Sequence, residues 1–245
     1  RVYRNEGVDS THSPEFTELE AYEAYGDYDT MAALTRDIVL DAAAAVGSFV
    51  VPDSRGGSID LRAPWHSVTV HEAVSAAVGV EVTIDTPVDE LRVLAAKSDV
   101  ALQPGWDHGQ VLLELFEKLV EHTLIEPTFV RDYPESVRPL ARPHRRDPRL
   151  VEAWDLIING VELAPAYSEL VDPVEQRNRL TRQSLLAAGG DPEAMQLDED
   201  FLRALEYGAP PMGGMGLGID RLVMLLTNSP SIRDVILFPH MRPQA

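Results

Sequence analysis

Two arginines near opposite ends of the chain stand in surroundings that suit a bound polyphosphate. Arg4 lies in the polar run Arg4-Asn5-Glu6-Gly7, and Arg221 ends the glycine-rich run Gly216-Leu217-Gly218-Ile219-Asp220-Arg221. Glycines in such a run let a ligand approach the backbone closely. Two cations placed this way predict a nucleotide held from both sides and bent for attack on its α-phosphate.

Side chains near Arg4 add the parts of a purine site. Glu6 shares a strand face with Arg4, so both side chains can point at one ligand. His12 lies in the polar loop that follows, and Phe16 offers an aromatic ring on which a base can stack. The ordinary alternatives are a surface ion pair for Arg4 and Glu6 and a solvated histidine. Taken together, the four residues favour a base cradle beside a phosphate clamp.

A row of polar side chains follows on the next predicted strand. Glu18, Glu20 and Tyr22 share one face of residues 15–25, because side chains two apart on a strand point the same way. A solvated edge would accept two glutamates, whereas the tyrosine and the nearby Phe16 favour a cleft. Glu20 in such a cleft could hold a substrate ammonium group.

The clearest short-range pattern is a hairpin around Asn159-Gly160. Asn-Gly between two apolar runs is the strongest sequence indication of a two-residue turn. The turn pairs Ile157 with Glu162 and sets Asp155 diagonal to Glu162, about 7–8 Å away between backbones. Two carboxylates at that separation can share a divalent cation, so the hairpin predicts a metal site, with two exposed hairpin charges as the alternative.

Composition narrows the function classes. The chain has 245 residues and 44% apolar content, enough for one large domain with a core. It carries 40 Asp and Glu against 21 Lys and Arg, net −19, a field that repels a nucleic-acid backbone and suits a cationic substrate or simple solubility. It has no cysteine, no run long enough to span a membrane and no signal peptide, which fits a cytoplasmic protein with no membrane contact from this segment. It starts inside a motif and without Met, so we expect an upstream part to be missing.

The first part of the chain predicts strands followed by a helix. Residues 1–8 and 15–25 are expected as strands joined by a polar loop. The helix that follows would be capped by Asp29 or Thr30. Residues 48–70 carry short strand-like pieces around a glycine-rich turn.

Helical spacing dominates residues 70–130. Thr86-Pro87 would start one helix with proline at its first position, and Asp107 or His108 would start another. The Pro- and Arg-rich residues 131–149 are expected as a loop or linker.

The last part of the chain returns to strands. A helix is expected from Asp198 to about Tyr207 with Gly208 as its cap, then a glycine-rich strand to Gly218 and a final helix. Residues 235–238 are expected as a last buried strand. Strands early and late, with helices between, favour an α+β fold with an antiparallel sheet over alternating βαβ units.

In these residues and motifs, the chain resembles the catalytic domain of class II aminoacyl-tRNA synthetases, specifically bacterial lysyl-tRNA synthetase. Residues 1–28 look like motif 2 and residues 214–227 look like motif 3. Similarity continues in Pro127-Thr128-Phe129, Asp132-Tyr133-Pro134, Pro139-Leu140-Ala141-Arg142, Tyr167-Ser168-Glu169-Leu170 and the tail 232–239.

The resemblance implies an α+β, class II synthetase-like antiparallel β-sheet flanked by helices, with a helical insertion between motif 2 and motif 3. It makes residues 1–245 one catalytic domain. Its parts are the motif 2 region 1–47, the intervening strands and insertion 48–150, and the metal hairpin and motif 3 region 151–245.

The resemblance also implies a role for each residue of the ATP site. Arg4 and Arg221 would be the catalytic cations, Arg4 on the α-phosphate and the amino-acid carboxylate, Arg221 on the γ-phosphate of bent ATP. Glu6 would bind the adenine amino group, with His12 near the outer phosphates. Phe16 would stack under the ring.

The implied amino-acid and metal sites lie beside it. The lysine pocket would consist of Glu20, Tyr22, Tyr167, Glu169 and Gly216, with Glu20 meeting the ammonium group. Mg²⁺ would be held by Asp155 and Glu162.

The implied reaction is ATP-dependent activation of lysine to lysyl-adenylate with Mg²⁺, then transfer to the 3′ acceptor end of tRNA(Lys), by a homodimeric cytoplasmic lysine–tRNA ligase. One alternative is a ligase that attaches lysine or β-lysine to a protein such as an elongation factor. Another is a non-catalytic lysine-binding paralogue. The full ATP and magnesium set is against the paralogue, because a sensor has no need of it.

The chain departs from the family pattern in three places. Asp155 stands where the family usually has glutamate, a conservative change. Pro165-Ala166 precedes Tyr167 where the family often has Asn-Gly, which removes a side-chain donor and an N–H. Glu162 and Glu169 differ in strand parity although both should face the cleft, so we expect a bulge at Pro165.

The family also has parts that this sequence does not contain. They are an anticodon-binding domain, motif 1 with its dimer-forming helix, and an upstream acidic residue of the lysine pocket. A fused domain that lysylates membrane lipid is a further alternative for the upstream part.

Overall fold

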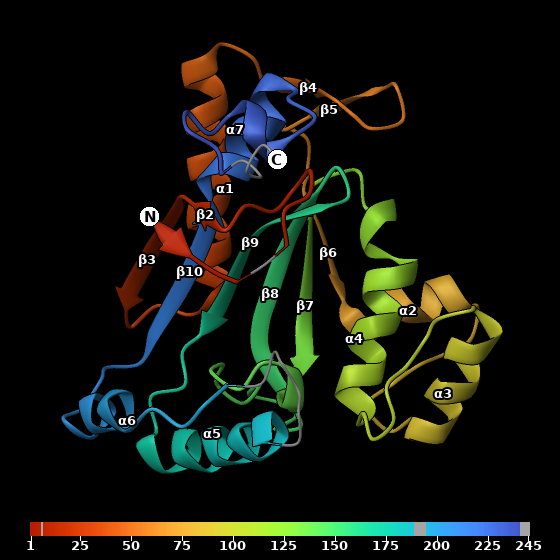
Figure 1. The fold of residues 1–245 in the computed structure, drawn as a ribbon, viewed down its shortest axis with the longest axis vertical. Helices are drawn as coiled ribbons and strands as arrows, with labels where there is room; N and C mark the ends of the chain where they lie inside the picture. Colours follow the sequence, from red (N-terminus) through yellow and green to blue (C-terminus); the bar gives the residue numbers. More distant parts are fainter. Residues whose placement is uncertain (6, 189–194, 241–245) are drawn as a thin grey trace, which may run out of the picture.

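A six-stranded sheet at the centre of the molecule carries most of the candidate residues. The computed structural model describes residues 1–5, 7–188 and 195–240. The strand order is β3-β10-β9-β8-β7-β6 (Figure 1), with bounds Glu18–Ala24, Met212–Gly218, Val161–Ser168, Leu150–Ile158, Thr128–Pro134 and His66–Thr69. The expected α+β fold is confirmed, as is the glycine-rich strand that ends at Gly218.

Every neighbouring pair in this sheet is antiparallel except β6 and β7, which run parallel at one edge. The sheet is therefore mixed, not wholly antiparallel as expected. A parallel pair needs a long crossover between its strands. Helices α2 (Val70–Val78), α3 (Val88–Lys97) and α4 (His108–Leu119) form that crossover and correspond to the expected helical insertion.

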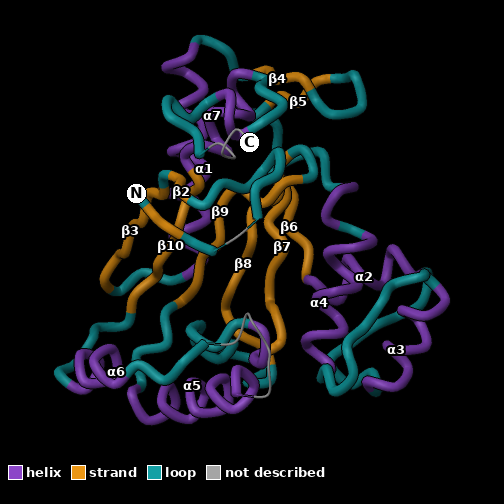
Figure 2. Tube along the Cα trace, in the orientation of Figure 1, coloured by secondary structure: helices purple, strands orange, loops and turns teal. Residues whose placement is uncertain are grey.

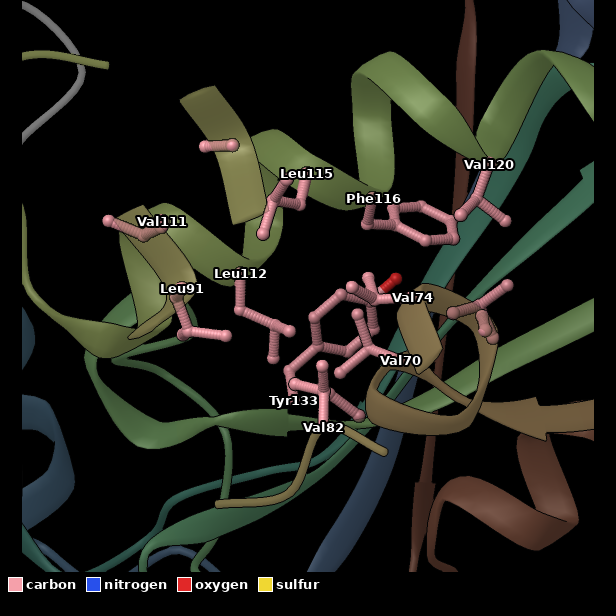
Figure 3. Packing of buried hydrophobic residues seen from close by; sticks show 14 of the residues in the cluster. Val70, Val74, Val82, Leu91, Val111, Leu112, Leu115, Phe116, Val120 and Tyr133 are labelled. Carbon is pink, nitrogen blue, oxygen red and sulfur yellow. The ribbon is translucent and has the colours of Figure 1, made fainter. Parts of the chain in front are cut away.

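The insertion packs an apolar core against β7 and β8. Thr69 and Asp107 cap α2 and α4 with reciprocal capping boxes, whereas Pro87 is the cap of α3 and not its first helical residue. Figure 3 shows the core, which includes Val70, Val74, Val82, Leu91, Val111, Leu112, Leu115, Phe116, Val120 and Tyr133. Tyr133 comes from β7, so the insertion core and the central sheet share this ring.

The other face of the sheet packs against α1 (Tyr28–Val46) and α7 (Ile219–Thr227). Successive residues of β8 alternate between the two faces, so Trp154 and Leu156 join this second core while Ile157 joins the first. Helix α1 is capped by Asp27, whose carboxylate accepts from the N–H groups of residues 29 and 30. The prediction of a cap at Asp29 or Thr30 was wrong, because the side chain that caps precedes the residues it bonds.

Two short strand pairs flank the sheet. β1 (Val2–Tyr3) pairs with β2 (Glu15–Phe16), and β4 (Val50–Pro52) pairs with β5 (Ser58–Asp60), as Figure 2 shows in orange. The strands expected over residues 1–8 and 15–25 are thus shorter. Thr17 separates β2 from β3, and its N–H donates to the Asp220 carboxylate at 2.6 Å.

Residues 131–149 are more ordered than the expected linker. Strand β7 runs to Pro134 and a 3₁₀ turn, Glu135–Val137, follows it. Arg142 and Arg145 then bond to the carboxylate of Glu152 at 2.7 and 2.5 Å, and Glu152 has no exposed area. Buried acceptors of this kind fix a loop that composition alone would leave free.

Helices α5 (Pro173–Ala188) and α6 (Glu199–Glu206) lie at one end of the sheet (Figure 1). Helix α6 begins after Asp198, as predicted. The strand predicted at residues 235–238 was wrong: a 3₁₀ turn, Ile232–Asp234, comes just before, and Leu237 and Phe238 are 85% and 91% exposed. A short apolar run becomes a strand only where another strand can pair with it. Among the described residues, the helices are too short or too polar to cross a membrane.

Candidate active site

The β8–β9 hairpin forms with the predicted register. Asn159 and Gly160 have φ of 57° and 74°, as a tight hairpin turn with two positive-φ residues requires. Ile157 pairs with Glu162 across the turn. The turn therefore sets the position of Glu162 relative to every residue of β8.

A bulge in β9 brings several of the predicted site residues to one face. The pairing with β8 slips at Leu163, which stands between Glu162 and the next paired residue. An extra residue reverses the alternation of side chains beyond it. Glu162, Pro165 and Tyr167 consequently line one cavity. The bulge expected from strand parity is present, but its predicted position at Pro165 was wrong, because the extra residue is Leu163.

This cavity has a volume of about 590 Å³. The predicted site residues that line it are Arg4, His12, Phe16, Asp155, Glu162, Tyr167 and Arg221. Asp155 is only 4% exposed. Burial, and then the Asp155 carboxylate, raise the pKa of Glu162 to about 7. A nearby cation would favour the charged form of Glu162.

Arg138 supplies one such cation and was missed in the sequence. Its Nη2 donates to Asp155 Oδ2 at 2.5 Å, and its guanidinium lies 4.5 Å from the centre of the Tyr133 ring. Asp155 Oδ1 is buried and has no hydrogen-bond partner among the described residues. In sequence Arg138 belongs to an arginine-rich stretch in which it looks like any exposed arginine.

The carboxylate pair fits Mg²⁺ bound together with a nucleotide. The described residues contain no group of three or more acidic or histidine side chains close enough to hold a metal by themselves. Mg²⁺ is commonly held by one or two carboxylates plus substrate phosphates, so a full protein cage is not required. The unpartnered Oδ1 of Asp155 and the carboxylate of Glu162 are the oxygens that would meet the ion.

Arg4 and Arg221 reach this cavity from the two ends of the chain. Arg4 Nη2 donates to Glu18 Oε2 at 3.3 Å, and its guanidinium lies 5.2 Å from the centre of the Phe16 ring. Arg221, in the first turn of α7, donates from Nη1 to the Glu162 carbonyl at 2.7 Å. Glu18, which the sequence placed on the right face without assigning it a role, thus orients Arg4.

His12 joins the N-terminal loop to Arg221. The two side chains are 209 positions apart in sequence, yet His12 Nε2 lies 3.1 Å from Arg221 Nη2. A guanidinium only donates, so Nε2 accepts and the ring proton lies on Nδ1. Nδ1 is 2.9 Å from Asp9 Oδ2, which can accept that proton. Glu6, predicted to bind adenine, lies outside the described residues.

The predicted lysine pocket lies on β3, β10 and the end of β9. Tyr22 OH donates to Glu20 Oε2 at 3.4 Å. Burial, and then the Glu20 charge, raise the pKa of Glu169 to about 7. A Cβ on Gly214, opposite Tyr22, would collide with Glu169 Oε1 and lie 2.7 Å from the Tyr22 ring.

Gly216 is the partner of Glu20 in the β3–β10 pair, and a Cβ there would lie 3.0 Å from Glu18 Oε1. Glycine at these places makes room for two carboxylates and a tyrosine. The pocket is open to solvent, since Tyr22 is 61% exposed.

A mixed sheet with a cavity between an N-terminal loop and the start of a C-terminal helix is the arrangement of a class II tRNA synthetase domain. The family model described as tRNA synthetases class II (D, K and N) matches residues 1–242, and the chain belongs to this family.

Several proteins are similar over the whole chain. The "Lysylphosphatidylglycerol biosynthesis bifunctional protein LysX" of Nocardia farcinica is 55% identical over 249 residues, covering 100% of this chain and 22% of that protein. The proteins of the same name from Gordonia bronchialis and Mycobacterium marinum are 54% and 53% identical over 248 residues, covering 99% of this chain and 22% of each. The chain thus spans about a fifth of the length of the curated relatives it matches.

Proposed function

We propose that this chain activates lysine with ATP and Mg²⁺ to give lysyl-adenylate, and then transfers the lysyl group to the 3′ end of tRNA(Lys). The observation that carries the amino-acid choice is the acidic pocket of Glu20 and Glu169 next to a cavity lined by Arg4 and Arg221. Two carboxylates suit a cationic side chain. An aspartate side chain would be repelled there, and an asparagine side chain would leave the carboxylates without a counter-charge.

The proposed reaction begins when a lysine carboxylate oxygen attacks the α-phosphorus of ATP. The bond from that phosphorus to the bridging oxygen breaks, and pyrophosphate leaves. Arg4 would hold the α-phosphate and the lysine carboxylate, while Arg221 would hold the γ-phosphate. Orientation and charge supply the catalysis, and no protein nucleophile is needed. When bound at Asp155 and Glu162, Mg²⁺ would neutralise phosphate charge.

Other residues would orient the two substrates. Phe16 would stack on the adenine ring, and His12 would contact the outer phosphates from its place beside Arg221. Tyr22 and Tyr167 would enclose the lysine side chain, with Gly216 leaving room for it. Pro165 offers the substrate no N–H, so a contact made there by a backbone donor is lost.

The names of the relatives favour one use for the product. Those proteins are named for lysylphosphatidylglycerol biosynthesis. A carboxylate does not esterify a hydroxyl group without activation, so a protein that makes such a lipid needs a source of activated lysine. We propose that this domain supplies it as lysyl-tRNA within a longer protein. A ligase with a protein acceptor is compatible with the same site, and Pro165 is the one sequence feature that favours a purely lysine-binding role.

The test is amino-acid-dependent ATP–pyrophosphate exchange by the full-length protein with Mg²⁺. Lysine, ornithine, β-lysine, aspartate and asparagine are compared. Exchange with lysine well above the others is expected. Exchange with β-lysine in preference, or with aspartate, would reject the assignment of the pocket.

A second assay identifies the acceptor. Radiolabelled lysine is followed into tRNA, into protein and into phosphatidylglycerol vesicles, with and without ribonuclease. We expect label on tRNA, and label on lipid only when tRNA is intact. Direct transfer to protein, or to lipid after ribonuclease, would contradict the tRNA step.

A further inference from the structure

Arg138 places a permanent positive charge against the metal hairpin. Its guanidinium bonds to one oxygen of Asp155 at 2.5 Å and lies 4.5 Å from the centre of the Tyr133 ring. The side chains of Arg138 and Asp155 are 20% and 5% exposed. The pair is largely withdrawn from water, where an ionic interaction is stronger than at the surface.

Helix α5 and a 3₁₀ turn fix the backbone that carries this arginine. The Arg138 N–H donates to the Glu135 carbonyl at 3.3 Å, and the Glu135 carboxylate pairs with Arg179 of α5 at 2.9 Å. Gln176, also on α5, donates from Nε2 to the Pro139 carbonyl at 3.2 Å. The guanidinium is therefore held in place before any ligand arrives.

Two arginines contact the hairpin, and each one bonds to a different residue. Arg221 uses Nη1 for the Glu162 carbonyl and has Nη2 beside His12. Arg138 is bound to the carboxylate of Asp155 itself. Only one oxygen of Asp155 is then left for a metal ion, together with Glu162.

We infer that Arg138 is a positioning residue that makes divalent-cation binding at this hairpin depend on the nucleotide. It withholds Asp155 Oδ2 from the ion and repels the ion by its own charge. The triphosphate supplies the missing negative charge and oxygen ligands, so the ion enters with ATP. This inference rests on the proposed function, because the metal role of Asp155 and Glu162 belongs to it.

Removal of Arg138 should lower the stability of the protein and raise its affinity for a divalent ion. Without the guanidinium, the carboxylate of Asp155 loses its bonded cation, and Arg221, which contacts the Glu162 carbonyl, is the remaining cation at the hairpin. A divalent ion then relieves the repulsion between Asp155 and Glu162 and takes over the place of the arginine. Loss of Arg138 should weaken the fold in chelator and strengthen metal binding in the absence of ATP.

The experiment measures Mn²⁺ binding to the full-length protein by electron paramagnetic resonance, without nucleotide and then with a non-hydrolysable ATP analogue. Wild type should bind Mn²⁺ weakly alone and at least about tenfold more tightly with the analogue. Arg138→Met should bind Mn²⁺ alone at least about tenfold more tightly than wild type. Arg138→Lys, which keeps the charge, should stay near wild type.

Two controls locate the ion. Arg146→Met removes the same charge from an exposed place on the same loop and should leave Mn²⁺ affinity unchanged. Asp155→Asn added to Arg138→Met should abolish the gained affinity. Thermal unfolding gives a separate measure, since Mn²⁺ should raise the unfolding temperature of Arg138→Met more than that of wild type.

A folded Arg138→Met protein with wild-type Mn²⁺ affinity would overturn the inference. So would tight Mn²⁺ binding by wild type without nucleotide, a measurement that needs no variant to fold. Pyrophosphate exchange on wild type is scored separately. Its failure would reject the proposed reaction and leave the Mn²⁺ pattern to decide the role of Arg138.

Discussion

The carboxylate of Glu152, which has no exposed area, accepts a hydrogen bond from Ser168 Oγ at 2.6 Å and so ties β8 to β9 beside the proposed amino-acid pocket. Ser168 Oγ in turn accepts from the N–H of Tyr28 at 3.1 Å, at the start of α1. Ser168 stands between Tyr167 and Glu169, the two pocket residues of this segment. The buried carboxylate therefore fixes the backbone from which the side chains of Tyr167 and Glu169 extend.

Glu152→Gln should destabilise the protein by about 2–3 kcal/mol, the value of charged hydrogen bonds to a buried acceptor. The expected loss of stability is no larger because Arg145 is 54% exposed, so water screens its interaction with Glu152. Urea denaturation measures the loss. Ser168→Ala removes its bond to Glu152 and its bond from the Tyr28 N–H, and should cost about 1–2 kcal/mol. Equal losses for the two variants would contradict a network centred on Glu152.

The same carboxylate should make wild type acid-sensitive. Burial opposes ionisation, but Arg145, Ser168 and Arg142 outweigh it and lower the pKa of Glu152 from 4.5 to about 2. A lowered folded-state pKa gives stability that is present above pH 4.5 and lost as pH falls towards 2. Unfolding free energies measured from pH 5 to 2 should converge for wild type and Glu152→Gln. A constant gap between them would argue against this assignment.

Arg4→Ala and Arg221→Ala should each lower kcat/KM for lysine-dependent pyrophosphate exchange about 100-fold or more, as loss of a donor to transition-state charge does. Arg203→Ala is a matched control, since Arg203 pairs with Asp200 on α6 and is 66% exposed. It should retain wild-type activity. Full activity in Arg221→Ala would show that the γ-phosphate lies elsewhere.

Lysine affinity should depend on pH through Glu169. Its raised pKa, from 4.5 to about 7, means that the carboxylate is neutral below about pH 7 and cannot attract an ammonium group. KM for lysine should therefore rise as pH falls from 8 to 6, and this dependence should vanish in Glu169→Gln. Glu23→Gln, exposed on the same strand as Glu20, should keep the wild-type profile.

Ionisation of Glu169 should affect stability in the opposite sense to ionisation of Glu152. A raised folded-state pKa gives stability that is present below pH 4.5 and lost as pH rises through about 7. Glu169→Gln should therefore be more stable than wild type at pH 8 when no lysine is bound. Saturating lysine should reduce that difference, because the ammonium group compensates the buried charge in wild type only.

Gly214→Ala should close the lysine pocket while leaving the ATP site intact. The added methyl group would collide with Glu169 Oε1 and the Tyr22 ring, so one of these side chains must move. KM for lysine should rise about tenfold, corresponding to roughly 1.4 kcal/mol, with KM for ATP little changed. Ala24→Val, which adds apolar bulk at the exposed end of β3, is the control. A parallel rise in KM for ATP would mean that the pocket and the ATP site are not separable.

The hairpin and the surroundings of each arginine were predicted from local rules, because each depends on residue types at short spacing. Asn159-Gly160 admits few turns, and the register of Glu162 follows from it. The family resemblance added which phosphate each of Arg4 and Arg221 would hold, an assignment that no local rule gives and that stays a prediction. The position of the bulge could not be predicted from the sequence. Leu163 resembles any apolar strand residue, and it is left unpaired only because of how β9 pairs with β8.

Arg138 shows the other limit of sequence interpretation. Its guanidinium contacts Asp155 of β8 and the Tyr133 ring of β7, while α5 fixes the neighbouring backbone. Such long-range contacts produce no periodic pattern in the sequence. The failed strand at residues 235–238 has the same origin. Whether an apolar run is buried depends on a partner that sequence spacing does not reveal.

The ring of Tyr133 belongs both to the core of the helical insertion and to the stack beneath Arg138. Its side chain has no exposed area, so the ring is fixed only once α2 and α4 have packed against β7. Packing of the insertion therefore reaches the charged hairpin, although the insertion itself supplies no charge there. A substitution that loosens the core around Tyr133 should also loosen the ring against which the Arg138 guanidinium lies, and so disturb Asp155 from a distance.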